Sequence, residues 1–238
     1  MQLASTSKGR RQRPESLAGR IYARLKAEIS EFRLLPGDRF SEGDVAERMA
    51  ASRTPVRQAL HRLEREGYLE VRFRSGWQVK AFDFEHFEEL YELRIVLELE
   101  AVRRLCTRPI DAQPEALQRL GRTWMVQPRL DDGPEVSRLD EEFHCQLLEA
   151  AGNREMARIH REVSEKIRII RRLDFTQAPR IDATYAEHAA ILQAIGERKC
   201  EEAQQLLRTH IETSKAEVRK ITLHMLHSAR QRPQPDQG

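Results

Sequence analysis

The sequence predicts a mainly α-helical protein in two parts: three helices with a two-stranded hairpin, then an all-α bundle of six or seven helices. Apolar residues recur at helical spacing along residues 17–66, and two short β-like runs follow at 69–72 and 77–80. From about residue 83 the spacing is helical throughout. A chain of 238 residues is long enough for two small domains, so the change of pattern predicts a domain boundary at about residue 82.

Two polar segments flank these parts. Residues 1–15 are polar and basic and residues 229–238 are rich in Pro and Gln, so we expect both to be disordered. The first domain is therefore expected at 16–82 and the second at 83–228. Within the second domain, the apolar spacing predicts six helices, at about 84–107, 113–125, 134–151, 154–175, 181–197 and 200–228.

The first two helices have recognisable starts and stops. The first helix is predicted at about 17–32, where apolar residues lie four apart, and it ends before a Pro-Gly turn. The second is a short helix at 42–49. Ser41 can cap its start, with Asp44 three residues later as the partner in a capping box.

The third helix is expected to run to Glu66. We predict Thr54 as its N-cap because Pro55 follows and proline suits the first helical position. Gly67 then provides the stop, since glycine adopts the left-handed conformation that ends many helices. Gly76 closes the turn between the two β-like runs for the same conformational reason.

Composition excludes several classes of protein. No run approaches the ~18 apolar residues that a membrane-spanning helix needs, and the basic N-terminus lacks the apolar core of a secretory signal. The three cysteines, Cys106, Cys145 and Cys200, are odd in number and far apart, as in a protein of the reducing cytoplasm. We expect a cytoplasmic, nucleoid-associated protein without a membrane partner.

The charge is concentrated in the first domain. Residues 1–80 contain 17 Lys and Arg against 10 Asp and Glu, a net charge of +7, whereas the remainder has 24 against 28, or −4. A basic domain suits a polyanion partner. On charge alone, a solvated basic face is an equally good interpretation.

The order helix, turn, helix, turn, helix and hairpin is that of a winged helix-turn-helix, whose recognition helix enters the DNA major groove. Arg53 and Arg57 are four residues apart and share one face of the third helix, and arginine can bind guanine through two hydrogen bonds. The hydroxyl groups of Ser52 and Thr54 can bind phosphates. Arg74 makes the hairpin, the wing, basic.

The runs SRTPVRQAL (52–60) and LEREGYL (63–69) resemble the GntR family of regulators. The resemblance implies a homodimer on a palindromic double-stranded operator, with DNA contacts from Arg53, Thr54 and Arg57 and with Gly76 at the wing tip. The chain departs from the family where many relatives carry a base-contacting arginine in the second helix, because Gly43 stands there. The operator sequence therefore cannot be transferred from relatives.

Four polar residues lie on apolar stripes of the second domain. Asp140 and His144 are four residues apart in one predicted helix, and His188 and His210 lie in the two last helices. Buried imidazole and carboxylate groups need partners. One divalent cation would satisfy all four, because a helical bundle can supply metal ligands from facing helices. The alternative is that each is a hydrogen-bonded core residue.

The DEEFH run (140–144), the LLEAAGN run (147–153) and the EH pair at 187–188 resemble the FCD ligand-binding domain of GntR regulators, in the FadR/VanR-like subfamily. In metal-binding members the matching Asp and three His hold a divalent ion, which implies a site for Zn, Ni, Mn or Fe here. Arg94, on the apolar stripe of the first helix of this domain, matches an arginine of relatives and could bind an effector carboxylate. The alternative is an internal ion pair with Glu98.

We therefore predict a non-enzymatic, ligand-responsive regulator, expected to be a repressor, with a small carboxylate as effector. The alternatives are a metal-dependent enzyme with a DNA-binding appendage, and an architectural DNA binder whose second domain only dimerises. Trp77 is expected to be a packing residue. His61, further along the third helix, could contact phosphate, and solvent exposure is the favoured alternative. The other histidines show no partner pattern and are predicted at the surface: His86, His160, His224 and His227.

Overall fold

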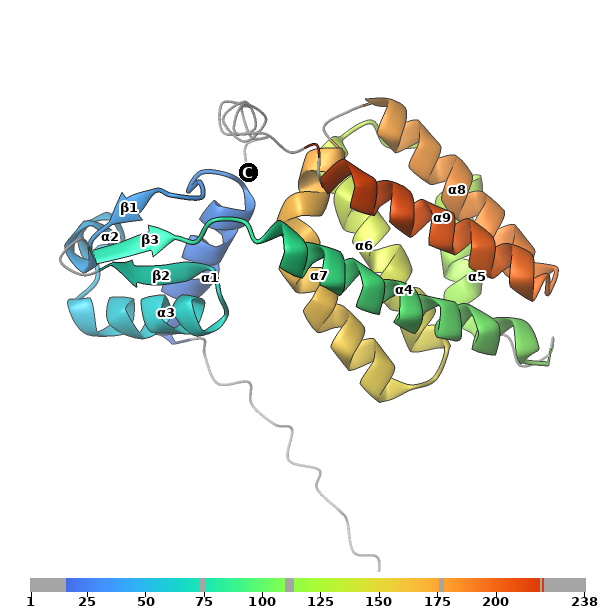
Figure 1. Cartoon of the computed structure of the whole chain (residues 1–238), viewed down its shortest axis with the longest axis horizontal. Coiled ribbons are helices and arrows are strands. Elements are labelled where there is room, and N and C mark those ends of the chain that lie inside the picture. Colours follow the sequence, from blue (N-terminus) through green and yellow to red (C-terminus); the bar gives the residue numbers. More distant parts are fainter. Residues whose placement is uncertain (1–15, 73–75, 110–113, 176–177, 219, 221–238) are drawn as a thin grey trace, which may run out of the picture. The chain divides into compact units, whose positions relative to one another are not determined.

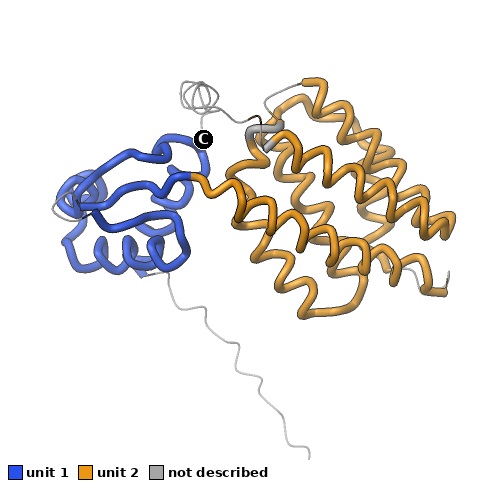
Figure 2. Tube along the Cα trace, in the orientation of Figure 1, with its two compact units in different colours: residues 1–81 blue, residues 82–238 orange. Residues whose placement is uncertain are grey.

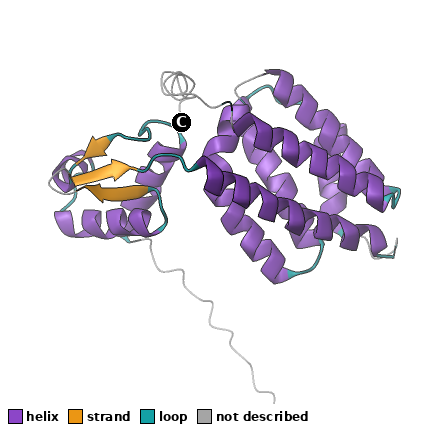
Figure 3. Cartoon of the chain, viewed as in Figure 1, coloured by secondary structure: helices purple, strands orange, loops and turns teal. Residues whose placement is uncertain are grey.

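The computed structural model describes residues 16–72, 76–109, 114–175, 178–218 and 220. The chain divides into two compact units, residues 1–81 and 82–238 (Figure 2). Three predictions fall outside the described residues: the two disordered tails, the contact assigned to Arg74, and the surface positions of His224 and His227. The described strands all belong to the first unit, and the second is helical (Figure 3).

The first unit combines three helices with a small antiparallel sheet (Figure 1). The predicted pair of wing strands is confirmed, with Leu69 opposite Val79. A two-residue strand, which is too short to show an alternating pattern in the sequence, pairs with the other edge of the second wing strand. The elements are α1 (Leu17–Ser30), β1 (Arg39–Phe40), α2 (Glu42–Arg48), α3 (Arg53–Arg65), β2 (Leu69–Arg72) and β3 (Gly76–Val79), with the strand order β1-β3-β2.

The helix ends of this unit follow local chemistry. Ser41 Oγ accepts a hydrogen bond from the Asp44 N–H at 3.1 Å and Asp44 returns one at 2.8 Å, so the predicted capping box is confirmed. The prediction of Thr54 as N-cap was wrong, because α3 begins at Arg53 and Ser52 is its N-cap residue. Pro55, the third residue of α3, is accommodated because the first N–H groups of a helix have no intrahelical partner.

Two residues fix the wing against the rest of the unit. Gly76 has a φ of +80°, and a Cβ atom there would lie 2.7 Å from the Phe40 carbonyl oxygen. Glycine is therefore required both by conformation and by the close approach of β1. Trp77 is buried, which confirms that it packs in the core.

The second unit is a bundle of six described α-helices and one π-helical segment, η2 (Figure 1). Helix α4 packs against α9, α9 against α8, and α6 against α7. The single helix expected at 113–125 is instead α5 followed by η2, with Gly121, a poor helix former, at the junction. The elements are α4 (Phe84–Thr107), α5 (Glu115–Gly121), η2 (Arg122–Val126), α6 (Gly133–Ala150), α7 (Arg154–Asp174), α8 (Ala178–Gly196) and α9 (Cys200–Val218).

The helices do not have the character of membrane spans. Among those that the structure describes, none combines the length and the apolar composition that a crossing requires. The apolar side of α6 faces the bundle interior, where Phe143, Leu147 and Leu148 are fully buried. The predicted metal ligands of α6 lie on this same inward-facing side, which positions the site described next.

Candidate metal centre and DNA-binding face

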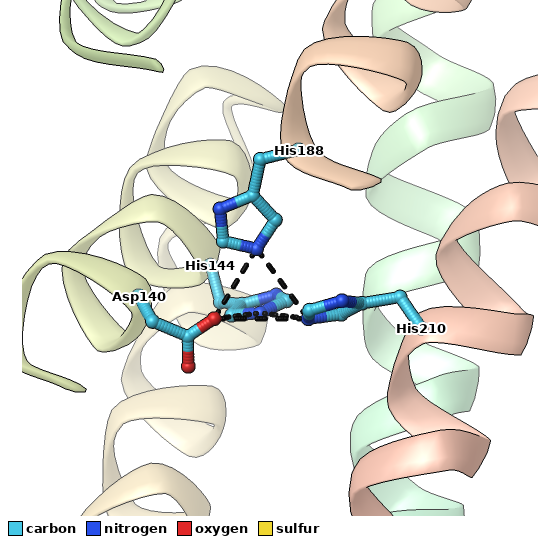
Figure 4. A group of neighbouring side chains, drawn as sticks. All are labelled: Asp140, His144, His188 and His210. Carbon is cyan, nitrogen blue, oxygen red and sulfur yellow. Dashed lines mark hydrogen bonds and ion pairs between the residues drawn. The ribbon is translucent and has the colours of Figure 1, made fainter. Parts of the chain in front are cut away.

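The four predicted ligands meet inside the bundle. Asp140 and His144 come from α6, His188 from α8 and His210 from α9, and all four are buried. Figure 4 shows the three imidazole rings and the carboxylate pointing toward one another. Asp140 Oδ1 lies 3.6 Å from His144 Nε2, 3.2 Å from His188 Nε2 and 3.7 Å from His210 Nε2. His210 Nε2 lies 3.2 Å from His144 Nε2 and 3.4 Å from His188 Nε2.

These separations suit a single metal ion. A metal bound at about 2.0–2.2 Å by N and O ligands places neighbouring tetrahedral ligands about 3.4 Å apart. Five of the six donor pairs, at 3.2–3.7 Å, lie around this value, and all four donor atoms lie within 4.8 Å of one another. The donor set of three imidazoles and one carboxylate is accepted by Zn, Ni, Mn and Fe.

The protonation of the cluster favours a cation further. Burial lowers the pKa of His188 and of His210 to about 4, and burial also lowers the pKa of His144, so the rings are neutral at pH 7. Asp140 Oδ1 accepts no well-aligned hydrogen bond from a described residue. The lone pairs of Asp140 Oδ1 and of the histidine Nε2 atoms therefore face one another, with too few protons to form a hydrogen bond at each contact. A divalent ion at their centre would accept these lone pairs.

Two carboxylates orient two of the rings. Glu98 Oε2 lies 2.5 Å from His144 Nδ1, and Glu187 Oε2 lies 2.6 Å from His210 Nδ1. A proton on each Nδ1 leaves the Nε2 lone pair directed at the centre, as in carboxylate–histidine–metal arrangements. The sequence prediction treated Glu98 only as an alternative partner of Arg94 and missed Glu187, although it adjoins His188.

His188 is positioned differently. Its ring stacks on Phe143 with centroids 3.7 Å apart and an interplanar angle of 7°. Trp124, in η2, meets the same ring edge-on at 4.2 Å. No described residue hydrogen-bonds to His188 Nδ1, so aromatic packing holds this ring in place.

Arg171 of α7 holds the carboxylate of Asp140. Its Nη2 donates a hydrogen bond to Asp140 Oδ2, which leaves Oδ1 to face the histidines. Burial alone raises the pKa of Asp140, but the charge of Arg171 and the neighbouring histidines outweigh burial and hold the pKa well below its ordinary value. Sequence reasoning missed Arg171, although its place beside the buried Ile167 and Ile170 is a signal for a buried, paired arginine.

The predicted surface position of His160 was wrong. This residue is fully buried, and its Nε2 lies 2.9 Å from Glu98 Oε1. Its spacing from the buried Ala157, Val163 and Ile167 of α7 is helical, and that spacing could have placed it inside. His86, by contrast, is about half exposed, as predicted.

Arg94 is buried at the same site. Its Nε donates to Glu98 Oε1 at 2.6 Å, so the internal ion pair considered from the sequence is present. Its Nη2 has no acceptor among the described residues. Because an unpaired buried N–H costs free energy, this atom is a donor available to an added anion.

Three of the predicted DNA-contacting residues, Arg53, Thr54 and Arg57, lie on the exposed face of α3. Val56, Leu60 and Leu63 fill the opposite, buried face. The exposed side forms a shallow hollow of about 410 Å³ without an acidic side chain in its lining, which consists of Arg53, Thr54, Arg57, Gln58, His61 and Arg65. Cationic and hydrogen-bonding groups on the exposed face of such a helix are the features needed for phosphate and base contacts.

Ser52 and Gly76 flank this face along the chain. Ser52 precedes α3, is exposed and makes no capping hydrogen bond through its side chain, so its hydroxyl is free to bind another group. Gly76 begins β3 of the wing. The structure thus brings the described candidates to α3 and its flanking elements within one unit.

The fold and the basic recognition helix define a winged helix-turn-helix DNA-binding protein with a helical second domain. Residues 17–79 match the gntR family of bacterial regulatory proteins, and residues 89–213 match the FCD domain. The chain therefore belongs to the GntR family of transcriptional regulators, as the sequence motifs indicated. It is 34% identical to the Nta operon transcriptional regulator of Aminobacter aminovorans over 182 residues, which cover 74% of this chain and 82% of that protein.

Other relatives agree with this assignment. The HTH-type transcriptional regulator YdhC of Bacillus subtilis is 27% identical over 191 residues, covering 80% of this chain and 85% of that protein. A crystal structure of a GntR transcriptional regulator from Rhodococcus sp. RHA1 aligns with a TM-score of 0.65 at 24% identity, covering 86% of this chain and 98% of that one. This second likeness shows a shared fold.

Proposed function

We propose that this protein is a repressor whose operator binding is controlled by a small carboxylate bound at a metal ion in the second unit. The convergence of Asp140, His144, His188 and His210 on one buried point carries the proposal. The protein acts in the cytoplasm. It binds a palindromic operator as a homodimer, because a two-fold symmetric regulator matches a two-fold symmetric site. Its role is binding and not catalysis.

The effector class follows from the coordination and the charge of the site. Four protein ligands leave one or two positions open on a five- or six-coordinate ion, and a carboxylate oxygen can fill them. The free Nη2 of Arg94 supplies a hydrogen-bond donor for the same anion. We assign Arg94 to effector binding on this basis, with Glu98 as its internal partner.

Control of DNA binding would operate through a shift between dimer geometries. Effector binding favours one spacing of the two recognition helices over another, and only one spacing matches the operator half-sites. A coupling free energy of ~1–3 kcal/mol is typical of such regulators. The DNA contacts are assigned to Ser52, Arg53, Thr54 and Arg57 of the first unit, with Arg74 and Gly76 of the wing.

The first test is metal content. Untagged wild-type protein is expected to contain about one Zn, Ni, Mn or Fe ion per chain by elemental mass spectrometry, and His144→Ala and His210→Ala are expected to lose it. His86→Ala is the matched control, because it removes an exposed histidine and should retain the metal. Absence of metal from wild type after incubation with each ion would contradict the site and leave a second domain that only dimerises.

A further inference from the structure

An ion pair joins the recognition helix to the start of α2. Arg57 Nε donates to Glu42 Oε1 at 2.9 Å and to Oε2 at 3.2 Å, and Arg57 Nη2 donates to Oε2 at 2.8 Å. Arg57 is the fifth residue of α3 and Glu42 the first of α2. The two helices are thus linked by a bidentate ion pair beside the basic hollow of α3.

This geometry leaves half of the guanidinium free. Arginine has five N–H groups in a planar fork, and Glu42 uses the edge formed by Nε and one N–H of Nη2. The other edge, formed by Nη1 and the second N–H of Nη2, has no partner among the described residues. That edge is the one that binds guanine O6 and N7 through two parallel hydrogen bonds.

We propose that Glu42 is a specificity-determining residue that positions Arg57, so that its free edge recognises a G·C pair in the operator. The inference rests on the DNA-binding part of the proposed function and is independent of the metal. Glu42 does not contact the base itself. It restricts the rotation of an otherwise exposed, flexible side chain and thereby reduces the entropy that base binding would lose.

The local structure keeps Glu42 in place. The capping box between Ser41 and Asp44 fixes the first turn of α2, in which Glu42 lies. Gly43 has no side chain, and the Asp44 carboxylate is used in the capping box. Glu42 is therefore the residue of this turn whose carboxylate reaches α3. The hydrogen bond from Arg57 lowers the pKa of Glu42 below its ordinary value, which keeps this carboxylate ionised.

Two simpler roles for Glu42, stabilising the fold and repelling phosphates, predict results that differ from those of positioning. A merely stabilising pair would contribute little here, because Arg57 is 60% exposed and ion pairs in water are screened by solvent and salt. A carboxylate near DNA also repels phosphates, so its charge alone would weaken binding to every sequence equally. Positioning instead predicts an effect confined to one base pair of each half-site.

The experiment uses the full-length protein without added effector. Wild type first selects its preferred sites from a random DNA pool, and dissociation constants are then measured for the selected site, its single-base variants and unrelated DNA. Glu42→Gln is compared with Arg57→Ala, with the double variant, and with Glu47→Gln, which removes the same charge from the same helix at an exposed position. Thermal unfolding of each variant reports on folding.

Glu42→Gln is expected to lower the discrimination at one G·C pair of each half-site, the ratio of the dissociation constants for variant and selected DNA, by about tenfold. This lies within the ~5–150-fold discrimination that one bidentate base contact supplies. The double variant should lose no more at that pair than Arg57→Ala. Equal tightening on all sequences, matching Glu47→Gln, would overturn the inference alone. A wild-type protein that selects no sequence would overturn it together with the DNA-binding part of the proposed function.

Discussion

Replacing Glu187 by glutamine should weaken metal binding without unfolding the bundle. In the structure Glu187 Oε2 lies 2.6 Å from His210 Nδ1, and Arg180 Nη1 donates to both oxygens of the same carboxylate, at 3.1 and 2.9 Å. Glutamine has the same shape and can still accept from His210, but it lacks the charge that makes the imidazole a stronger metal ligand.

The expected loss is about tenfold in affinity, equivalent to about 1.4 kcal/mol. Loss of a partner of this kind costs ~10–100-fold. The lower end applies because the Glu187 side chain is 31% exposed and water can replace part of its role. Glu98, which is fully buried and shared with Arg94, would be a less informative site to alter, since its loss leaves a buried arginine unpaired.

The assay is a chelator competition with Zn or Ni, carried out on wild type, Glu187→Gln and the control Glu201→Gln. Glu201 is exposed near the start of α9, the helix that carries His210, so its variant should bind like wild type. Equal affinity of Glu187→Gln and wild type within twofold would refute the view that this carboxylate orients His210 for metal binding.

Two further predictions concern the first unit. Gly76→Ala should lower the free energy of unfolding by at least ~1–2 kcal/mol, the cost of a left-handed conformation for a residue with a Cβ atom. The clash of that Cβ atom with the Phe40 carbonyl oxygen adds to this cost. Urea unfolding measures the change, and an unchanged midpoint would contradict the requirement for glycine. Glu66 accepts hydrogen bonds from Tyr22, Lys26 and Arg62, and although burial opposes them they lower its pKa below 4.5. Its stabilisation is therefore present above that pH and lost as the pH falls below it, and Glu66→Gln should flatten this acid dependence in urea titrations; an unchanged dependence would contradict the role of Glu66.

The sequence predicted that Asp140, His144, His188 and His210 face the bundle interior because their pattern is local. Asp140 and His144 are four residues apart on one helix, and His188 and His210 interrupt apolar stripes, so a single helix at a time shows which side chains face inward. The groups around the ligands come from other helices. Arg171 and His160 of α7 contact residues of α6 and α4, and these pairings depend on the packing of helices, which spacing within one helix does not encode.

The same limit applies to the first unit. The motif predicted the helices, the wing and the basic face, yet it placed the start of α3 two residues late because Thr54 and Ser52 are both plausible caps. The pair formed by Glu42 and Arg57 spans 15 residues and two helices. The sequence did not predict this pair, because it depends on how α2 and α3 pack together. Each residue alone has the pattern of a solvated surface charge.

The buried charges of the second unit have a consequence for how its ligands cooperate. Arg94 is matched by Glu98 and Arg171 by Asp140, while the three ligand histidines are neutral at pH 7. These two buried ion pairs carry no net charge, and a divalent ion would add two positive charges in a medium of low dielectric constant. A carboxylate would offset part of this excess, so metal and effector should each strengthen the binding of the other by the same factor.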